Sequence, residues 1–218
     1  MGPRIDHYDW DGGREALLRF GPEVGPIVVL ALPLFEEANR TRTFAVALLR
    51  ALAARGIAGL LPDVPGQNES LTPLAGLTLA DMQAALAGVA PDRRTYGVGI
   101  RSGALLDTAS HRRWHFAPQT GARLIRLLHR TWRAAGNRGP IPDPVEIAGN
   151  CLPAALLASL AEAVPHADRI VRLATDPDPA DRVITAAPLW RRAEPGSDPV
   201  LVEVLADDIA AWIAACDT

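Results

Sequence analysis

The sequence predicts an α/β fold in which a mostly parallel central sheet carries helices on both faces. Short apolar runs alternate with longer stretches of helical periodicity along the chain, which is typical of successive βα units. The run at residues 26–32 is continuously apolar rather than alternating, as expected for a strand buried on both faces. With 218 residues, 49% of them apolar, the chain can bury one substantial core. We therefore expect a single domain over residues 1–218.

The first half of the chain gives a regular series of elements. Pro33 ends the buried strand, Gly56 stands where a C-cap glycine follows a helix, and Thr78 and Asp81 are typical of a helix start. The expected strands are residues 15–20, 26–32, 57–61 and 95–100, and the expected helices are residues 41–55, 78–89 and 103–109.

The second half centres on an amphipathic helix at residues 121–135. Its polar face carries Arg123, Arg126, Arg130 and Arg133, and we interpret this charged stripe as a solvated helix surface. Three prolines and two glycines at residues 136–144 predict a loop, so residues 118–144 form a candidate lid or cap segment. The other expected elements are strands at residues 114–117, 169–174 and 182–186, a short segment at 145–148, and helices at 153–163 and 199–215.

Charge and composition exclude several classes of function. The formal net charge is −3, which gives no electrostatic reason to expect nucleic-acid or membrane-surface binding. All 22 basic residues are arginine. Without lysine there can be no Schiff-base amine, no Ser-Lys dyad and no phosphate-loop lysine.

Neither a metal, a cofactor nor a disulfide is expected. Cys151 and Cys216 lie far apart and form no CxxC or Cys/His cluster. Residues 1–13 lack the basic and apolar regions of a signal peptide, and no stretch reaches the roughly 18 apolar residues of a membrane span. We therefore expect a cytoplasmic protein without a transmembrane segment.

The sharpest local feature is residues 96–104, where a buried strand runs into a glycine-flanked turn and then a helix. This is the context of the G-x-S-x-G nucleophile elbow. Gly99 and Gly103 occupy the two glycine positions, and Arg101 occupies the nucleophile position. A guanidinium stays protonated and offers no lone pair, so an acyl-enzyme at Arg101 is excluded. Ser102 is a candidate nucleophile only if the turn shifts by one residue; otherwise it would supply a backbone N–H to an oxyanion site.

Two further loops follow predicted strands and belong to the same edge of the sheet. In the turn at residues 63–70, Asn68 stands where α/β-hydrolases have a glycine, and asparagine tolerates left-handed backbone geometry. Residues 34–42 stand where hydrolases complete the oxyanion hole. Their candidate pocket residues are Phe35, Glu36, Glu37 and Asn39. Their charges suit either a polar pocket mouth or local ion pairs and helix capping, and both interpretations stay open.

Five stretches together resemble the exosortase A system-associated hydrolases of the second type, within the α/β-hydrolase superfamily. They are Gly13-Arg14, the run LFEEANRTR at 34–42, Leu61-Pro62-Asp63, GIRSGALL at 99–106 and VEIAG at 145–149. The resemblance spans roughly residues 12 to 190 in unchanged order. In that family the Glu-Glu-x-Asn-(Lys/Arg) stretch and an elbow arginine are typical, so Arg101 looks inherited. The resemblance implies an α/β-hydrolase-like domain that accompanies exosortase and exopolysaccharide machinery, and it implies no particular reaction.

The other members of a triad can be sought by chain order, which in this fold is nucleophile, acid, histidine. Asp176, just past the strand that ends at residue 174, is the expected acid. The histidine should lie near Trp190, yet the last histidine of the chain is His166. His115, at a strand end, is a substitute candidate, although a lone histidine there is more often structural. Trp190 itself fits a pocket wall or the core equally well.

Three hypotheses follow. In the first, an α/β-hydrolase-like domain without a standard triad binds an anionic or sugar-like small molecule in a charged pocket, or Arg101 pairs with a glutamate and holds a scaffold closed. In the second, the chain is an esterase or thioesterase. In the third, it docks on a partner of the exosortase or exopolysaccharide system through residues 121–135. The pocket of the first uses Arg101, Glu36, Glu37, Asn39 and Asp176, and the esterase uses Ser102, His115 and Asp176.

Overall fold

The computed structural model describes residues 2–90 and 93–217, and an eight-stranded sheet lies at its centre. The strand order is β1-β2-β4-β3-β5-β6-β9-β10. Strands β1 and β2 run antiparallel to their neighbours, and the strands from β4 to β10 are parallel. The predicted mostly parallel α/β sheet is therefore confirmed. The strands are β1 (Arg4–Trp10), β2 (Gly13–Phe20), β3 (Ile27–Ala31), β4 (Ala58–Pro62), β5 (Thr95–Ile100), β6 (Arg112–Phe116), β9 (Arg169–Leu173) and β10 (Arg182–Ile184).

Helices cover both faces of this sheet, as the sequence predicts. Because side chains alternate along a strand, Val28 and Leu30 of β3 join one core cluster while Ile27 and Val29 join the other. The first cluster packs under α1 and α5, and the second under α2, α3 and α4. The helices are α1 (Glu36–Ala54), α2 (Leu79–Ala87), α3 (Gly121–Ala134), α4 (Ala154–Ala161) and α5 (Pro199–Cys216).

Several element boundaries differ from the prediction. Strand β1 was not expected, because Tyr8 is its only buried residue and an exposed edge strand lacks the apolar pattern. Helix α1 begins at Glu36, five residues before the expected start at Thr41, because no side chain caps it and the sequence gives no N-cap signal there. Thr78 and Asp81 do form a capping box at the start of α2. Three short helices complete the structure, namely η1 (Leu74–Gly76), η2 (Arg101–Leu105) and η3 (Leu189–Arg191).

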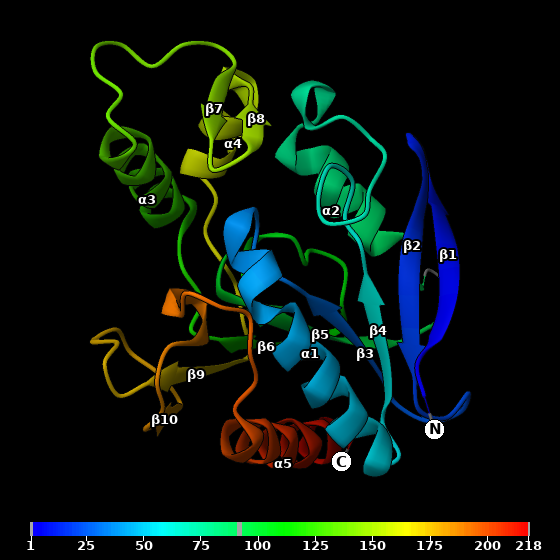
Figure 1. Ribbon diagram of the computed structural model, residues 1–218. Coiled ribbons are helices and arrows are strands. Elements are labelled where there is room, and N and C mark those ends of the chain that lie inside the picture. Colours follow the sequence, from blue (N-terminus) through cyan, green and yellow to red (C-terminus); the bar gives the residue numbers. More distant parts are fainter. Residues whose placement is uncertain (1, 91–92, 218) are drawn as a thin grey trace.

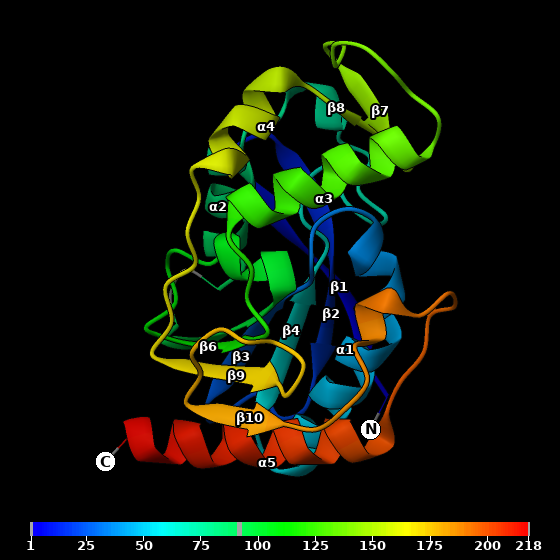
Figure 2. The ribbon, with the colours of Figure 1, turned by 90° about the vertical axis from the view of Figure 1, so that its left-hand side faces the viewer.

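A large excursion from the sheet connects β6 to its neighbour β9. It contains α3, the hairpin of β7 (Val145–Ile147) and β8 (Asn150–Leu152), and α4. These elements gather at one end of the molecule, and α5 lies at the opposite end (Figures 1 and 2). Helix α3 buries Leu124, Leu128 and Trp132, whereas residues 136–140 of the following loop are exposed. That residues 118–144 act as a lid stays a prediction.

Candidate functional site

The turn after β5 has the backbone geometry of an elbow. Arg101 has a φ of 53°, a left-handed conformation that is costly for a non-glycine residue and marks a tightly constrained turn. A Cβ atom on Gly103 would lie 2.3 Å from the carbonyl oxygen of Ala31, and one on Gly99 would lie 2.7 Å from the Cα of Ala104. The strand, the turn and η2 therefore pack too closely to accept side chains at the two glycines. Arg101 stands at the apex.

This close packing predicts a large effect for a single methyl group. The substitution Gly103→Ala is expected to lower the free energy of unfolding by about 2 kcal/mol, because the new Cβ would overlap backbone atoms of the neighbouring strand end. Urea unfolding followed by circular dichroism measures the change. Gly76→Ala is the matched control, since its Cβ would meet nothing within 4 Å. Equal stability of the two variants would show that the turn is not under this constraint.

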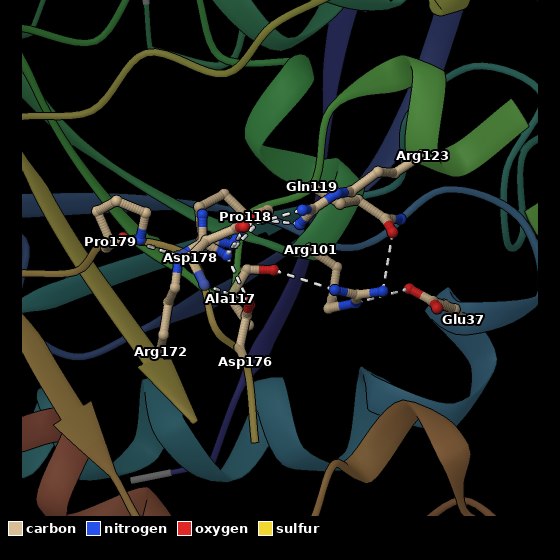
Figure 3. Close-up of polar contacts among 10 residues, drawn as sticks. All are labelled: Glu37, Arg101, Ala117, Pro118, Gln119, Arg123, Arg172, Asp176, Asp178 and Pro179. Carbon is tan, nitrogen blue, oxygen red and sulfur yellow. Dashed lines mark hydrogen bonds and ion pairs between the residues drawn. The ribbon is translucent and has the colours of Figure 1, made fainter. Parts of the chain in front are cut away.

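The Arg101 side chain is held by three acceptors and one aromatic ring. Its Nε donates to Oε2 of Glu37 at 3.3 Å, its Nη1 to the carbonyl oxygen of Ala117 at 3.2 Å, and its Nη2 to Oε1 of Gln119 at 2.8 Å (Figure 3). The guanidinium carbon lies 4.5 Å from the ring centroid of Trp190, a cation–π contact. The side chain is 15% exposed. Arg101 is thus a fixed, nearly buried positive charge.

The backbone N–H groups of the loop that would complete an oxyanion hole already donate to side chains of the protein itself. The Leu34 N–H donates to Oγ of Ser102 at 2.9 Å, and the Phe35 N–H donates to Oε1 of Gln67 at 2.7 Å. Oxyanion catalysis needs such N–H groups free to meet the developing negative charge. Ser102 is fully buried, so its hydroxyl anchors this loop. Asn68, next to Gln67, has a φ of 51°, as its left-handed tolerance predicts.

A cavity of about 360 Å³ opens beside Arg101, within the size range of small-molecule sites. Its lining joins α3, the segment after β9 and the region of η3. Five arginines of this lining come from three separate parts of the chain: Arg101, Arg123, Arg126, Arg130 and Arg191. Leu127, Leu173 and Trp190 supply apolar surface between them. All four arginines of the α3 stripe are exposed, as expected for a solvated helix surface, and Arg123, Arg126 and Arg130 also line this cavity.

Only some of these positive charges are balanced. Arg123 makes two hydrogen bonds to the carboxylate of Asp178, and Arg172 binds Asp176 with Nη1 to Oδ2 at 2.6 Å (Figure 3). Within residues 2–90 and 93–217, three arginines of the lining have no side-chain hydrogen bond or ion pair and are exposed, namely Arg126, Arg130 and Arg191. The cavity is thus bordered by three unpaired arginines.

The candidate pocket residues from the sequence fall in different places. Asp176 and Trp190 line the cavity with Arg101. Glu37 pairs with Arg101, whereas Glu36 forms an ion pair with Arg40 one turn further along α1. Phe35, Glu36 and Glu37 border a second cavity of only about 40 Å³. Asn39 is exposed on α1 and lines neither cavity.

The catalytic candidates are not joined by hydrogen bonds. His115 is fully buried in β6, on the strand face opposite Trp114 and Phe116, and among the described residues neither ring nitrogen has a partner. Burial lowers the pKa of His115 to about 4, and the positive charge of Arg113 acts in the same direction. The Ser102 hydroxyl is bonded to Leu34. The structure therefore does not join Ser102, His115 and Asp176 into one hydrogen-bonded relay.

Sequence reasoning missed several residues of this region, Gln67 and Arg191 among them. The side chain of Gln67 accepts a hydrogen bond from the Phe35 N–H, 32 residues away in the chain, and no local pattern signals such a contact. Arg191 reaches the cavity only because η3 folds against α1 and the sheet end. The sequence signal for this residue was the pair of arginines at 191–192, which directly follows Trp190 and the expected histidine position.

Neither a metal-binding cluster nor a disulfide is found among the described residues. No group of three or more His, Cys, Asp or Glu side chains in residues 2–90 and 93–217 could hold a metal ion. Cys151 and Cys216 are both free. Over the same residues, every helix is too short or too polar to span a bilayer.

Comparison with solved structures establishes the class of fold. Epoxide Hydrolase A from Mycobacterium thermoresistibile is similar with a TM-score of 0.57 and 16% identity, over 94% of this chain and 97% of that one. A protein from Agrobacterium vitis S4 named as a hydrolase is similar with a TM-score of 0.55 and 15% identity, over 96% and 97%. The chain therefore has the α/β-hydrolase fold. At these identities the similarity shows the fold alone.

Other matches are to longer proteins. An epoxide hydrolase from Vigna radiata matches with a TM-score of 0.45 and 15% identity, over 52% of this chain, and the match spans only 39% of that protein. No family model matches the sequence, and no curated protein matches it either.

Proposed function

We propose that this α/β-hydrolase-fold protein binds a small anionic ligand in the cavity beside Arg101 and does not use a serine for hydrolysis. The observation that carries the proposal is the set of three unpaired arginines around a cavity of about 360 Å³. Arginine suits carboxylate and phosphate groups because its planar fork of donors binds two oxygens at once. The three like charges border one cavity, and an anion bound among them reduces their mutual repulsion.

Four features of the elbow support a role without hydrolysis. Arg101 stands where the nucleophile would be, and the adjacent Ser102 is buried and bonded to the Leu34 N–H. The second N–H of the loop is capped by Gln67, and His115 touches neither Ser102 nor Asp176 through a hydrogen bond. An esterase built on Ser102 would have to break these contacts before it could act.

Calorimetric titration with inorganic phosphate at low salt tests the binding proposal. We expect binding by the unmodified protein and roughly tenfold weaker binding by Arg126→Gln, because a hydrogen bond to a charged group contributes about 1.5 to 3 kcal/mol. Arg50→Gln is the control, since it removes the same charge from an exposed position on α1. Absence of phosphate binding, or equal weakening in the control, would contradict a site in this cavity.

Labelling with a fluorophosphonate tests the esterase alternative. We expect intact-protein mass spectrometry to show no adduct, because the hydroxyl of Ser102 is buried and has no histidine base. A serine hydrolase in the same reaction serves as the positive control. An adduct mapped to Ser102, together with hydrolysis of p-nitrophenyl esters, would establish the esterase instead.

The resemblance described above supports a narrower proposal on biological setting. We propose that the protein accompanies the exosortase and exopolysaccharide machinery as a ligand-binding accessory. Docking through the arginine face of α3 is less favoured, because Arg126 and Arg130 line the cavity and Arg123 is bonded to Asp178. We expect the protein to co-purify with components of that machinery. Charge reversal at Arg133 should leave this co-purification unchanged. Loss of co-purification on that change would favour the docking function.

A further inference from the structure

We infer that the ligand of this cavity carries two adjacent anionic groups, as a diphosphate does, held between α3 and η3. This inference rests on the proposed function and makes its ligand class specific. It depends on three properties of the site. They are the number of unpaired arginines, their placement on two parts of the lining, and the carboxylate that Arg123 already binds on the same face of α3.

The first property is the charge count. Arg101 is balanced by Glu37, Arg123 by Asp178 and Arg172 by Asp176. The three unpaired and exposed arginines of the lining leave a net charge of about +3 around the cavity. One phosphate monoester carries about −1.5 to −2 near neutral pH and would leave about one positive charge unbalanced. Two linked phosphate groups carry roughly −3, which matches the site.

The second property is the placement of these charges. Arg126 and Arg130 lie one turn apart on α3, where Cβ atoms four residues apart are about 5–6 Å from each other. Two guanidinium groups in such a row can each bind one of two neighbouring anionic groups. Arg191 belongs to η3, on another part of the lining. A ligand between them would therefore bridge the α3 excursion and the body of the domain.

The third property is an internal precedent on the same helix face. Arg123, one turn before Arg126, binds the carboxylate of Asp178 through both terminal nitrogens, with Nη2 to Oδ1 at 2.9 Å (Figure 3). The first position of the row is thus occupied by an anion from the chain itself. Arg126 and Arg130 continue the row without such a partner among the described residues. One position of the row thus binds an anionic group of the chain itself, and the next two are open to a ligand.

The space and the apolar lining agree with a ligand larger than a single phosphate. A volume of about 360 Å³ corresponds to on the order of a dozen water molecules. Leu127 and Leu173 line the same cavity, next to Pro188. These side chains suit an organic group attached to the anionic end, since small-molecule sites combine apolar walls with a few fixed polar contacts.

Calorimetric titrations with inorganic phosphate and with pyrophosphate test this inference. We expect pyrophosphate to bind at least tenfold more tightly than phosphate, and Arg130→Gln or Arg191→Gln to weaken pyrophosphate binding roughly tenfold each. The double substitution of Arg126 and Arg130 by glutamine should remove the preference for pyrophosphate. Arg133→Gln is the control, because it removes the same charge from α3 outside the cavity. Circular dichroism checks that each variant stays folded.

The outcomes separate this inference from the proposed function. Equal affinity for phosphate and pyrophosphate, both dependent on Arg126, would overturn the two-group ligand and leave an anion site in place. A preference for pyrophosphate that falls as much in Arg133→Gln as in Arg130→Gln would show general charge attraction and also overturn it. Binding of neither anion would contradict both proposals.

Discussion

Replacing Asp208 with alanine is expected to lower the free energy of unfolding by about 3 to 5 kcal/mol. Asp208 lies on α5 and is 5% exposed. Its Oδ1 accepts hydrogen bonds from Nε1 of Trp114 and Nε of Arg169, both at 2.8 Å. Its Oδ2 accepts from Nη2 of Arg169 at 2.8 Å and from Nη1 of Arg182 at 2.7 Å. One carboxylate thus ties α5 to three neighbouring strands.

The cost of this substitution comes from the partners that it leaves behind. Burial alone would raise the pKa of Asp208, but the hydrogen bonds from Arg169, Arg182 and Trp114 outweigh it and lower the pKa to about 2. Because the folded-state pKa lies below the ordinary value, this stabilisation is complete above about pH 4 and is lost as the pH falls through about 2. Without the carboxylate, the buried Trp114 N–H has no acceptor and two arginines lose their counter-charge.

Urea unfolding at pH 7 measures the Asp208→Ala effect. The neighbouring Asp207→Ala is the matched control, since Asp207 is 69% exposed and pairs with Arg55 at the surface. Such exposed pairs contribute at most about 1 kcal/mol. Similar losses in the two variants would mean that the buried network does not hold α5 to the sheet.

The second large effect is a loss of stability in mild acid that originates at His115. Burial first, and then the charge of Arg113, lower the pKa of His115 from 6.5 to about 4. Above pH 6.5 the ring is neutral in both the folded and the unfolded chain, so it contributes no pH dependence. Between pH 6.5 and 4 the unfolded chain takes up a proton that the folded chain excludes, and stability falls as the pH falls. The total loss is about 3 kcal/mol.

Free energies of unfolding measured at intervals from pH 7 to pH 4 test this expectation. The difference in the free energy of unfolding between the unmodified protein and His115→Phe should change by about 3 kcal/mol over that range, since phenylalanine cannot take up the proton. His7→Gln removes an exposed histidine and serves as the control. Parallel pH profiles for the protein and His115→Phe would show that His115 gains a proton in the folded state as readily as in the unfolded chain.

Much of the fold could be predicted because its strands are apolar runs with clear ends. Strand β5 was predicted with the same bounds as observed, and the elbow after it follows from two glycines whose Cβ atoms would overlap backbone. Strand β1 could not be predicted in the same way. Its exposed edge position requires no apolar alternation, and only its pairing with β2 makes it a strand.

The site was only partly accessible to sequence reasoning. Arg101 and Glu37 were both identified, and their pairing was one of the alternatives left open. The cavity itself needs α3, the segment after β9 and η3 side by side, an arrangement that no local pattern encodes. The arginine stripe of α3 is exposed, as the sequence predicts, and only the folded chain shows that Arg126 and Arg130 also border a cavity.

A crystal structure of the protein with pyrophosphate tests the central claim most directly, because it locates the anion relative to the elbow. We predict that the anion lies in the arginine-lined cavity and contacts at least two of Arg126, Arg130 and Arg191. The Leu34 N–H would still donate to Ser102. An anion bound instead to the Phe35 N–H, with Gln67 displaced, would reveal a working oxyanion hole and contradict the proposal that this elbow has a binding role.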